Sequence, residues 1–362
     1  MVTRREYLKD LLIIAGLAAA GTSAASSPRY RTARFWYTMG NNVICDLCPN
    51  GCVLAEGKTG ICRSRRNIGG SLVTLGHSWP CAVHVDPVEK KPLYHVLPGA
   101  KTFSIGVAGC NLRCKNCQNY SLSQKSPLET ENVYLPPEKV IEEAKRRSCT
   151  IIAFTYSEPT VWIEYMLDTA ALARKAGIRS VLVSSGYINP APFSELAEVI
   201  DAAQIDLKSF DDKIYRDLNE GKLQPVLDTL KLAKKKGVWV EIVNLVIPQW
   251  TDKPEMIRLM CRWIAEELGP DTPLHFSRFF SLYKLSHLYP TPQKDLLAAR
   301  AIALKEKLSF VYIGNVPDLD SNTYCLKCGE LLLSRSGYIV DNQNFKSGHC
   351  GKCSAMIPGI WA

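Results

Sequence analysis

Eleven of the fourteen cysteines fall into three groups whose spacing suits metal binding better than disulfide formation. The first group is Cys45, Cys48, Cys52 and Cys62, the second is Cys110, Cys114 and Cys117, and the third is Cys325, Cys328, Cys350 and Cys353. Two cysteines with two residues between them can direct both thiolates at one metal ion from a single turn. Disulfide frameworks are typical of short secreted chains, whereas this chain has 362 residues. Cys81, Cys149 and Cys261 remain as ordinary core or inert thiols.

The central group, Cys110-x3-Cys114-x2-Cys117, follows a stretch that we expect to be a strand, Phe103–Val107. Three thiolates on one loop can bind three irons of a [4Fe–4S] cubane and leave the fourth iron without a protein ligand. An open coordination position is a feature of catalytic metal sites. A zinc ion completed by a distant histidine is the alternative.

The two outer groups contain four cysteines each, which is enough to close a metal site. In the C-terminal group two Cys-x2-Cys pairs are separated by 21 residues, and Gly329 and Gly351 allow tight turns, as in a zinc ribbon. A rubredoxin-like iron or an auxiliary iron–sulfur cluster is the alternative. The N-terminal group is less regular, and its spacing is compatible with zinc or with an auxiliary cluster. Pairing between the two ends also remains open.

Composition limits the function classes. With 46% hydrophobic and 22% charged residues the chain can bury a core. The net charge of +9 is compatible with an anionic ligand or partner, but the basic residues form no concentrated run. We therefore expect no nucleic-acid partner.

Residues 1–27 have the pattern of an export signal. Arg4 and Arg5 precede the apolar run Leu11–Ala20, and small residues follow. The paired arginines resemble a twin-arginine signal, and the alternatives are an uncleaved amphipathic helix or a start codon that was assigned too early. The apolar run is short for a membrane span, and no other stretch is long and apolar enough for one.

From residue 101 onward, short β-rich stretches alternate with longer helical ones. The expected strands are Phe103–Val107, Ile151–Phe154, Ser180–Ser184, Gln204–Leu207, Val238–Val243, Leu274–Phe276 and Phe310–Ile313. The expected helices are Pro137–Arg147, Val161–Lys175, Pro192–Ile200, Pro225–Lys235, Pro254–Leu268 and Gln293–Leu308. This alternation predicts an α/β fold with a parallel sheet, in the form of a partial (β/α)6 TIM-like barrel over residues 101–316. Residues 28–40 have the composition of a linker, and cysteine-rich modules are expected at 41–75 and 322–362.

Several further blocks support a specific resemblance. The cysteine triplet with its surroundings resembles the radical S-adenosylmethionine (SAM) signature. The wider match covers 86–95 (DPVEKKPLYH), 109–119, 155–160 (TYSEPT), 205–208 (IDLK) and 312–316 (YIGNV). Together these blocks resemble the radical SAM enzyme of the AmmeMemoRadiSam system, a family similar to pyruvate formate-lyase activating enzymes. The resemblance extends over roughly residues 41–362.

The resemblance implies a [4Fe–4S] cluster whose unique iron chelates SAM through its amino and carboxylate groups. One electron then cleaves SAM to methionine and a 5′-deoxyadenosyl radical, which abstracts hydrogen from a substrate. Tyr156 and Glu158 occupy the place of the ammonium-binding motif of the family, although Glu158 could instead be an ordinary carboxylate at a helix start. In place of a bulky residue before the last cysteine the sequence has Asn116, which cannot stack on adenine but can hydrogen-bond it.

Polar residues at the ends of the other expected strands complete the candidate site, because parallel barrels collect their active sites there. Ser184 and Ser185 follow the third strand, and their hydroxyls are candidates to bind ribose or a carboxylate. The alternative is that the two serines only form a turn. The later strands add Asp206, Lys208, Asn244, Ile247, His275 and Arg278. Of these, we predict catalytic roles for Lys208, His275 and Arg278. Asp206 and Lys208 share a strand face, which we expect to point inward.

Two classes of function fit these motifs. The first is a SAM-cleaving enzyme that acts on an unidentified substrate, with a low-potential electron donor and a MEMO-like or AMMECR-like protein among its candidate partners. The second is a non-catalytic iron–sulfur electron-transfer or metal-scaffold protein. SAM and low-potential electrons are found in the cytoplasm, so we expect cytoplasmic maturation, with export by the twin-arginine signal as the alternative.

Overall fold

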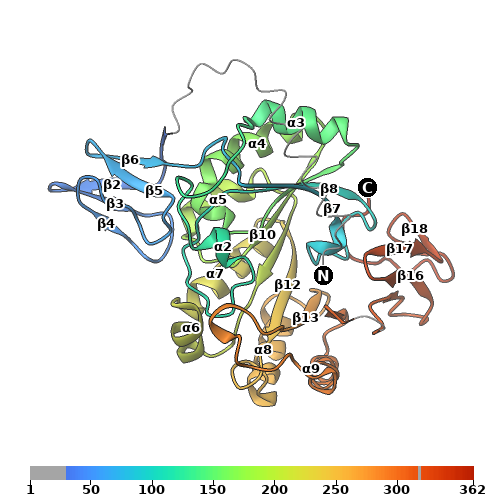
Figure 1. The fold of residues 1–362 in the computed structure, drawn as a ribbon. Coiled ribbons are helices and arrows are strands. Elements are labelled where there is room, and N and C mark those ends of the chain that lie inside the picture. The colour runs from blue at the N-terminus through green and yellow to red at the C-terminus, as the bar shows by residue number, and fades with distance from the viewer. Residues whose placement is uncertain (1–29, 317–318) are drawn as a thin grey trace. The chain divides into compact units, whose positions relative to one another are not determined.

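The computed structural model describes residues 30–316 and 319–362, so the predicted signal segment 1–27 lies outside the described residues (Figure 1). The chain divides into two compact units built from discontinuous stretches. Unit 1 takes the residues up to Asp86 together with 101–112 and 119–200. Unit 2 takes 87–100, 113–118 and 201–362. The boundary between the units crosses the central cysteine group, since Cys110 belongs to unit 1 and Cys114 and Cys117 to unit 2.

The core of unit 1 is a set of strands that carry helices. The strands lie in the order β7 (Ala82–Pro87), β8 (Lys101–Gly106), β9 (Ile151–Phe154) and β10 (Arg179–Ser184). β8 pairs with β9, and β9 with β10, in parallel. Every residue of β9 is buried, which is typical of a parallel strand covered on both faces. The helices are α2 (Tyr120–Ser123), α3 (Pro137–Arg146), η2 (Pro159–Trp162), α4 (Ile163–Lys175) and α5 (Pro190–Ala197), and α3 packs against α4 (Figure 1).

The N-terminal cysteine-rich part of unit 1 forms two small sheets. One contains β2 (Trp36–Met39), β3 (Asn42–Cys45) and β4 (Val53–Leu54), and the other β1 (Arg31–Thr32), β6 (Ser71–Thr74) and β5 (Arg65–Ile68). The prediction of a linker over 28–40 is therefore wrong for β1 and β2. β1 pairs with the distant β6, and such short strands leave no period that the sequence could reveal.

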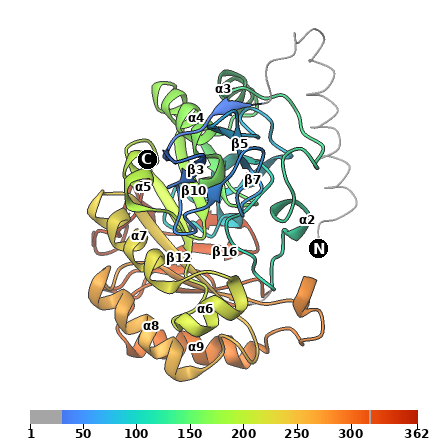
Figure 2. The same cartoon turned by 90° about the vertical axis from the view of Figure 1, so that its left-hand side faces the viewer.

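Unit 2 repeats the parallel arrangement. Its strands lie in the order β11 (Ala202–Asp206), β12 (Trp239–Val246), β13 (Leu274–Arg278) and β14 (Val311–Gly314), and all three pairings are parallel. Its helices are η1 (Val88–Lys90), α6 (Asp212–Asn219), α7 (Leu223–Lys235), α8 (Pro254–Glu267), η3 (Tyr283–Leu285) and α9 (Gln293–Lys305). α8 packs beside α9 (Figure 2), and α9 packs on β13 and β14.

The C-terminal module of unit 2 is made of short strands around a small apolar cluster. The strands are β15 (Thr323–Tyr324), β16 (Leu331–Ser336), β17 (Ile339–Asn342), β18 (Phe345–Lys346) and β19 (His349–Cys350). Leu332, Leu333 and Ile357 pack with Tyr94 and Tyr312. The module therefore shares its core with the 87–100 segment and β14.

The predicted α/β class with terminal extensions is confirmed, and each expected strand has a counterpart within three residues at either end. Closure into a partial barrel stays a prediction. Neither β7 nor α6 was predicted, although α6 is amphipathic and the side chain of Asp211 caps its N-terminus. Of the helices in 30–316 and 319–362, none has the length and apolarity to cross a membrane.

Candidate active site

The loop after β8 carries the three central cysteines. In unit 1, the backbone N–H of Leu112 lies 3.4 Å from Cys110 Sγ and donates a hydrogen bond to it. In unit 2, Cys114 is buried and Cys117 is half-buried, and the N–H of Cys117 donates to the Cys114 carbonyl at 3.2 Å. Thiolate sulfurs of metal sites commonly accept such backbone hydrogen bonds, so the loop is suited to hold iron.

The surroundings of Cys114 fit an anionic ligand sphere. Burial raises the pKa of the Cys114 thiol, while the Lys208 ammonium and the Asn219 amide oppose that rise. Asn219 is fully buried; its amide faces the Cys114 thiol, and its side chain has no other hydrogen-bond partner among the described residues. Buried amides are normally satisfied. An acceptor such as a cluster sulfide beside Cys114 would satisfy the Asn219 N–H.

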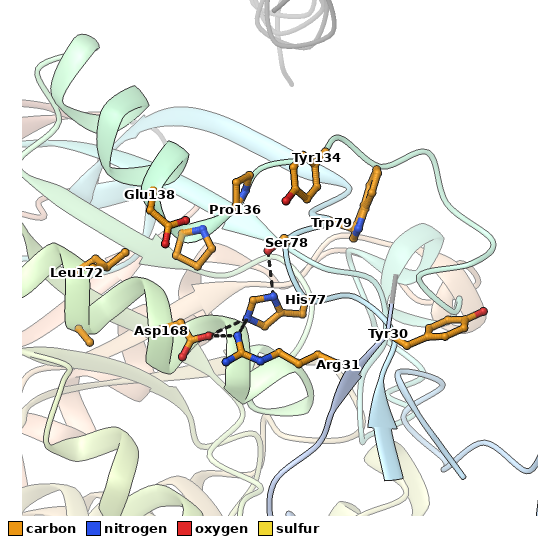
Figure 3. A pocket seen from close by; sticks show the side chains of 12 residues that line it. Tyr30, Arg31, His77, Ser78, Trp79, Tyr134, Pro136, Glu138, Asp168 and Leu172 are labelled. Atoms are coloured by element: carbon orange, nitrogen blue, oxygen red, sulfur yellow. Dashed lines mark hydrogen bonds and ion pairs between the residues drawn. The ribbon is translucent and has the colours of Figure 1, made fainter. Parts of the chain in front are cut away.

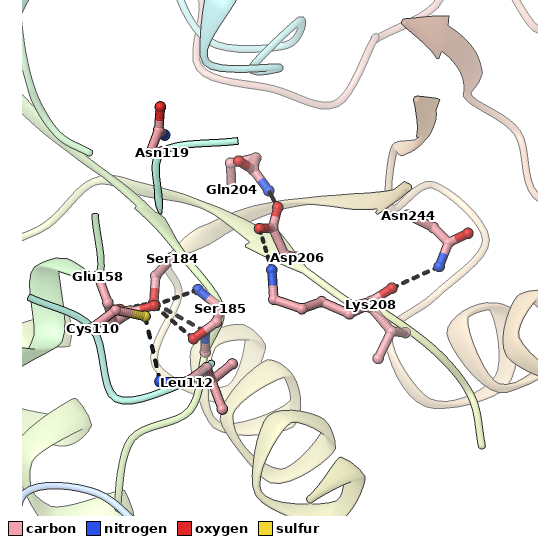
Figure 4. A network of polar contacts seen from close by, with 12 residues as sticks. Cys110, Leu112, Asn119, Glu158, Ser184, Ser185, Gln204, Asp206, Lys208 and Asn244 are labelled. Atoms are coloured by element: carbon pink, nitrogen blue, oxygen red, sulfur yellow. Dashed lines mark hydrogen bonds and ion pairs between the residues drawn. The ribbon is translucent and has the colours of Figure 1, made fainter. Parts of the chain in front are cut away.

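Asp206 and Lys208 lie together at the end of β11, as the sequence predicts (Figure 4). Lys208 Nζ is 2.8 Å from Asp206 Oδ2, and Gln204 Nε2 donates to Asp206 Oδ1 at 2.8 Å. Burial alone would lower the pKa of Lys208, but Asp206 and Cys114 raise it well above its usual value. Lys208 is therefore a fixed cation close to Cys114, which the sequence predicts to be a cluster ligand.

Glu158, Ser184 and Ser185 form one buried network in unit 1 (Figure 4). The Glu158 carboxylate accepts from the hydroxyls of Ser184 and Ser185 at 2.6 Å each and from the Ser185 N–H at 2.8 Å. Thr160 adds its N–H and its hydroxyl, at 3.3 and 3.0 Å. A carboxylate has about four lone-pair positions, so these donors fill it. Glu158 joins the ends of β9 and β10 in this structure.

Tyr156 has a backbone conformation that is rare for a residue with a side chain, with φ of +72°. Its hydroxyl donates to Asp86 Oδ2 at 2.6 Å, and its carbonyl accepts from Asn119 Nδ2 at 2.6 Å. Such strain persists only where the surroundings hold it, and it collects at functional sites.

Asn244 and Ile247 are both buried at the C-terminal end of β12. Asn244 Nδ2 donates to the Leu207 carbonyl at 2.8 Å, whereas Asn244 Oδ1 has no partner among the residues described. Asn116 Oδ1 is likewise buried and unpartnered within the described chain. Each of these oxygens is an acceptor that remains available to a bound molecule.

His275 and Arg278 lie in different surroundings. His275 Nε2 contacts Glu241 Oε2 at 2.8 Å in a fully enclosed group, and its ring packs on Tyr94 and Tyr312. Arg278 Nε donates to the Thr291 carbonyl at 2.9 Å, and its guanidinium lies over Phe280. Both side chains are engaged within unit 2, and a role toward substrate stays a prediction for each.

Comparisons with known proteins identify the family of this chain. Residues 104–260 match the family model of the radical SAM superfamily. An uncharacterized protein of Methanocaldococcus jannaschii is 41% identical over 90% of this chain and 98% of its own length. The chain belongs to the radical SAM superfamily. A pyruvate formate-lyase-activating enzyme of Clostridium pasteurianum is 26% identical over 46% of this chain and 70% of its own length.

Among solved structures, Streptococcus suis SuiB bound to precursor peptide SuiA has a TM-score of 0.47 and 14% identity, covering 63% of this chain and 51% of that chain.

Membership of the radical SAM superfamily decides between the two expected functions, because it makes the chain an enzyme of the activating-enzyme type. The non-catalytic alternative is therefore wrong. Enzymes of this superfamily need a reductant. The name AmmeMemoRadiSam stays a prediction.

The C-terminal cysteines of this radical SAM protein are arranged for one metal ion. The sulfurs of Cys325, Cys328, Cys350 and Cys353 all lie within 4.8 Å of one another. Two sulfur pairs, Cys325 with Cys353 and Cys328 with Cys350, are 3.6 Å apart. A tetrahedral zinc with bonds of about 2.3 Å places its sulfurs about 3.8 Å apart, which is close to this spacing.

Unit 1 has a further open pocket of about 580 Å³, away from any cysteine (Figure 3). His77 Nε2 contacts Asp168 Oδ2 at 2.9 Å, Ser78 Oγ lies 3.0 Å from His77 Nδ1, and Arg31 also bonds Asp168. Tyr134 and Trp79 pack together at its rim. Arg31, His77 and Asp168 are paired with one another in this pocket, and Glu138 also lines it.

Sequence reasoning missed several residues that structure this site. Asn219 lies in a helix that was not predicted, and Asn111, between the first two central cysteines, donates to the Tyr187 carbonyl at 2.6 Å. Glu241 lies inside an apolar strand, and a charged residue in such a run was the available signal.

Proposed function

We propose that this chain cleaves SAM reductively at a [4Fe–4S] cluster held by Cys110, Cys114 and Cys117 and abstracts a hydrogen atom from a substrate. The observation that carries the proposal is the set of buried, unpartnered polar atoms on Asn116, Asn219 and Asn244, all in the unit that holds Cys114 and Cys117. Buried groups without partners are rare in proteins and indicate a missing ligand. The bound cluster supplies one electron, and SAM gives methionine and a 5′-deoxyadenosyl radical.

The side chains of this chain bind and orient SAM. Asn116 Oδ1 and Asn244 Oδ1 are acceptors for amino or hydroxyl groups, such as those of adenine and ribose. Ser184 and Ser185 are held by Glu158, so Glu158 acts as a positioning residue and its carboxylate is not the free ammonium acceptor that the family motif implies. Ile247 supplies an apolar wall. Tyr156, through its strained backbone, sets the direction of the segment that follows β9.

Lys208 is the strongest of the three candidate catalytic residues. It is a cation beside Cys114 and is fixed by Asp206. A fixed positive charge stabilises the added electron on a neighbouring cluster, because it offsets the growing negative charge. We assign His275 and Arg278 to packing within unit 2. Mutagenesis of each residue tests the expectation that it also contacts the substrate.

We infer the substrate class from the relatives. Relatives named as activating enzymes of pyruvate formate-lyase suggest that the hydrogen donor belongs to a protein, and the MEMO-like and AMMECR-like proteins predicted from the resemblance are the partners to assay first. A reduced flavin or iron–sulfur carrier protein would supply the electron. We assign zinc to the C-terminal cysteines, on the sulfur spacing given above.

The test is anaerobic reconstitution with iron and sulfide, followed by addition of SAM and dithionite. We expect 5′-deoxyadenosine and methionine from the unmodified protein and neither from Cys114→Ala. Cys261→Ala serves as the matched control, because Cys261 is a buried thiol on α8 outside every group and its loss should leave the yield unchanged. Absence of product from a protein with its full iron content would overturn the proposal.

A further inference from the structure

The four N-terminal cysteines of unit 1 converge on one small cavity. Cys45, Cys48, Cys52 and Cys62 line it together with Arg65. A side-chain carbon on Gly60 would lie 3.6 Å from Cys52 Sγ and 3.7 Å from Cys62 Sγ. The three thiols of the 45–52 segment and the thiol of Cys62 therefore meet at one place, as ligands of one centre do.

The spacing of these sulfurs differs from that of the C-terminal group. Among the residues that the structure describes, only the C-terminal quartet brings its sulfurs within 4.8 Å of one another, and no three of the N-terminal sulfurs do so. A single tetrahedral ion needs sulfurs about 3.8 Å apart. A cluster of several irons carries its thiolates on different irons and holds them further apart. The wider N-terminal arrangement thus suits a cluster better than one zinc ion.

Charge around the cavity also suits a cluster. Arg65 is 1% exposed and lies 3.0 Å from Glu164, itself 3% exposed. Arg65 Nε has no hydrogen-bond partner among the described residues, although Arg65 lines the cavity. A buried guanidinium nitrogen without a partner is costly, and a cluster sulfide or thiolate would accept its hydrogen. Glu164 already offsets the charge of Arg65, so the negative charge of four thiolates requires cations in the cavity, such as the irons of a cluster.

The cavity lies directly behind the catalytic loop within unit 1. Ser64 Oγ donates to the Ala108 carbonyl at 2.7 Å, and Asn50 Nδ2 donates to the Asn111 carbonyl at 2.8 Å. Gly109 approaches so closely that a side-chain carbon there would lie 2.5 Å from the Cys62 carbonyl. Two cysteine-bearing turns of the N-terminal module thus hold the residues on both sides of Cys110.

We propose that Cys45, Cys48, Cys52 and Cys62 bind a second iron–sulfur cluster of two or four irons, which braces the loop that carries Cys110. The proposal rests on the proposed function only for the role of that loop. When bound, such a cluster supplies one-electron redox capacity beside the catalytic loop. The chain's own contribution is Arg65, which offsets the cluster charge, and the two hydrogen bonds from Ser64 and Asn50 to the loop.

The experiment measures metal in the full chain and does not depend on SAM cleavage. The variant Cys110→Ala/Cys114→Ala/Cys117→Ala lacks the catalytic cluster, and after anaerobic reconstitution its iron and zinc are counted and its iron is examined by Mössbauer and electron paramagnetic resonance spectroscopy. We expect about two or four irons per chain, with the spectra of a cluster, and about one zinc at the C-terminal quartet. Adding Cys48→Ala should remove the iron, whereas adding Cys149→Ala should not.

A second variant tests the site without removing a ligand. Arg65→Lys keeps the buried charge but lacks the Nε hydrogen, so it should lower the reduction potential of the remaining cluster while the iron content is unchanged. About two zinc ions and no iron in the triple variant would overturn the proposal, as would a single mononuclear iron or iron that persists after Cys48→Ala. Failure of the proposed function is a separate result, because it would leave this iron in place and abolish 5′-deoxyadenosine from the unmodified protein.

Discussion

At the residue scale, the carboxylate of Glu158 matters because every lone-pair position on it is occupied. It is 2% exposed, and the donors around it come from Ser184, Ser185 and Thr160. A change that preserves the shape of Glu158 but replaces one oxygen by an amide places a donor against a donor. The residue is therefore a sensitive probe of the SAM-binding end of β10.

We expect Glu158→Gln to weaken SAM binding by about tenfold or more and to cost about 1–3 kcal/mol of stability, because a buried donor loses its acceptor. The measurements are equilibrium SAM binding to the reconstituted protein and anaerobic chemical denaturation. Glu142→Gln, on the exposed side of α3, is the matched control and should change neither. Equal SAM affinity in Glu158→Gln and the control would contradict the positioning role.

Lys208 lies near Cys114 and is paired with Asp206, so it allows a test of electrostatics at the catalytic loop. We expect Lys208→Met to retain iron but to lower the rate of 5′-deoxyadenosine formation by about tenfold to hundredfold, as for the loss of about 1.5–3 kcal/mol of charge-assisted interaction. Lys213→Met removes an exposed lysine of α6 that is paired with Asp217 and is the control. A lower rate with an unchanged cluster reduction potential would contradict the electrostatic explanation.

At the scale of elements, the parallel strands and their helices could be predicted from the sequence, and much of the site could not. The apolar runs of β9 and β10 and the proline-led helices α3 and α8 have strong local patterns, which explains the agreement. The cysteine spacing predicted three candidate metal-binding groups, of which the C-terminal one has its sulfurs gathered closely enough for one ion. Asn219 and Arg65 became visible only once distant segments met, because nothing in their local sequence marks a buried unpartnered nitrogen.

The turn at Gly109 gives a prediction about how two elements fit together. Its φ of +105° disfavours any side chain, and an added carbon would lie 2.1 Å from Ser64 Oγ. We expect Gly109→Ala to displace the catalytic loop, to reduce iron at the catalytic cluster and to destabilise unit 1 by more than about 2 kcal/mol. Iron content and anaerobic denaturation measure both effects.

Gly177→Ala is the matched control for Gly109→Ala. Gly177 also has positive φ, +71°, but a carbon added there meets nothing within 4 Å. It should cost about 1 kcal/mol of backbone strain and leave the iron in place. If both variants lose equal stability and keep equal iron, then Gly109 is not required for close packing of the cysteine turn against the loop.

At the scale of the whole molecule, buried polar contacts join distant stretches of the chain within unit 2. Glu241 accepts from the N–H groups of Tyr94 and His95 at 3.0 and 2.8 Å, and Arg335 donates to the Tyr94 carbonyl at 2.9 Å. His95 joins Tyr312 at 2.8 Å and the Pro358 carbonyl at 2.7 Å. Burial lowers the pKa of His95 to about 4.

This shift makes stability depend on pH. Because the folded pKa of His95 lies below its usual 6.5, folding favours the neutral ring, so its contribution is complete above about pH 6.5 and declines as pH falls toward 4. Each pKa unit corresponds to about 1.4 kcal/mol, so the full loss in free energy of unfolding is of the order of 3 kcal/mol. We expect His95→Gln to be less stable at pH 7 and to show a shallower decline between pH 6.5 and 5, measured by anaerobic denaturation. Parallel curves for the two proteins would contradict this assignment.

The discontinuity of the two units has a consequence for biosynthesis. The ribosome releases residues 87–100 long before Pro358 and Ile360, to which His95 and Leu97 bond. Cys114 and Cys117 likewise emerge before β11 and α6, the elements that surround Cys114. The nascent chain therefore exposes Cys114 and Cys117 until β11 and α6 have emerged, so we expect the proposed catalytic cluster to be loaded only after that point, whereas the N-terminal quartet has its whole surrounding unit by residue 200.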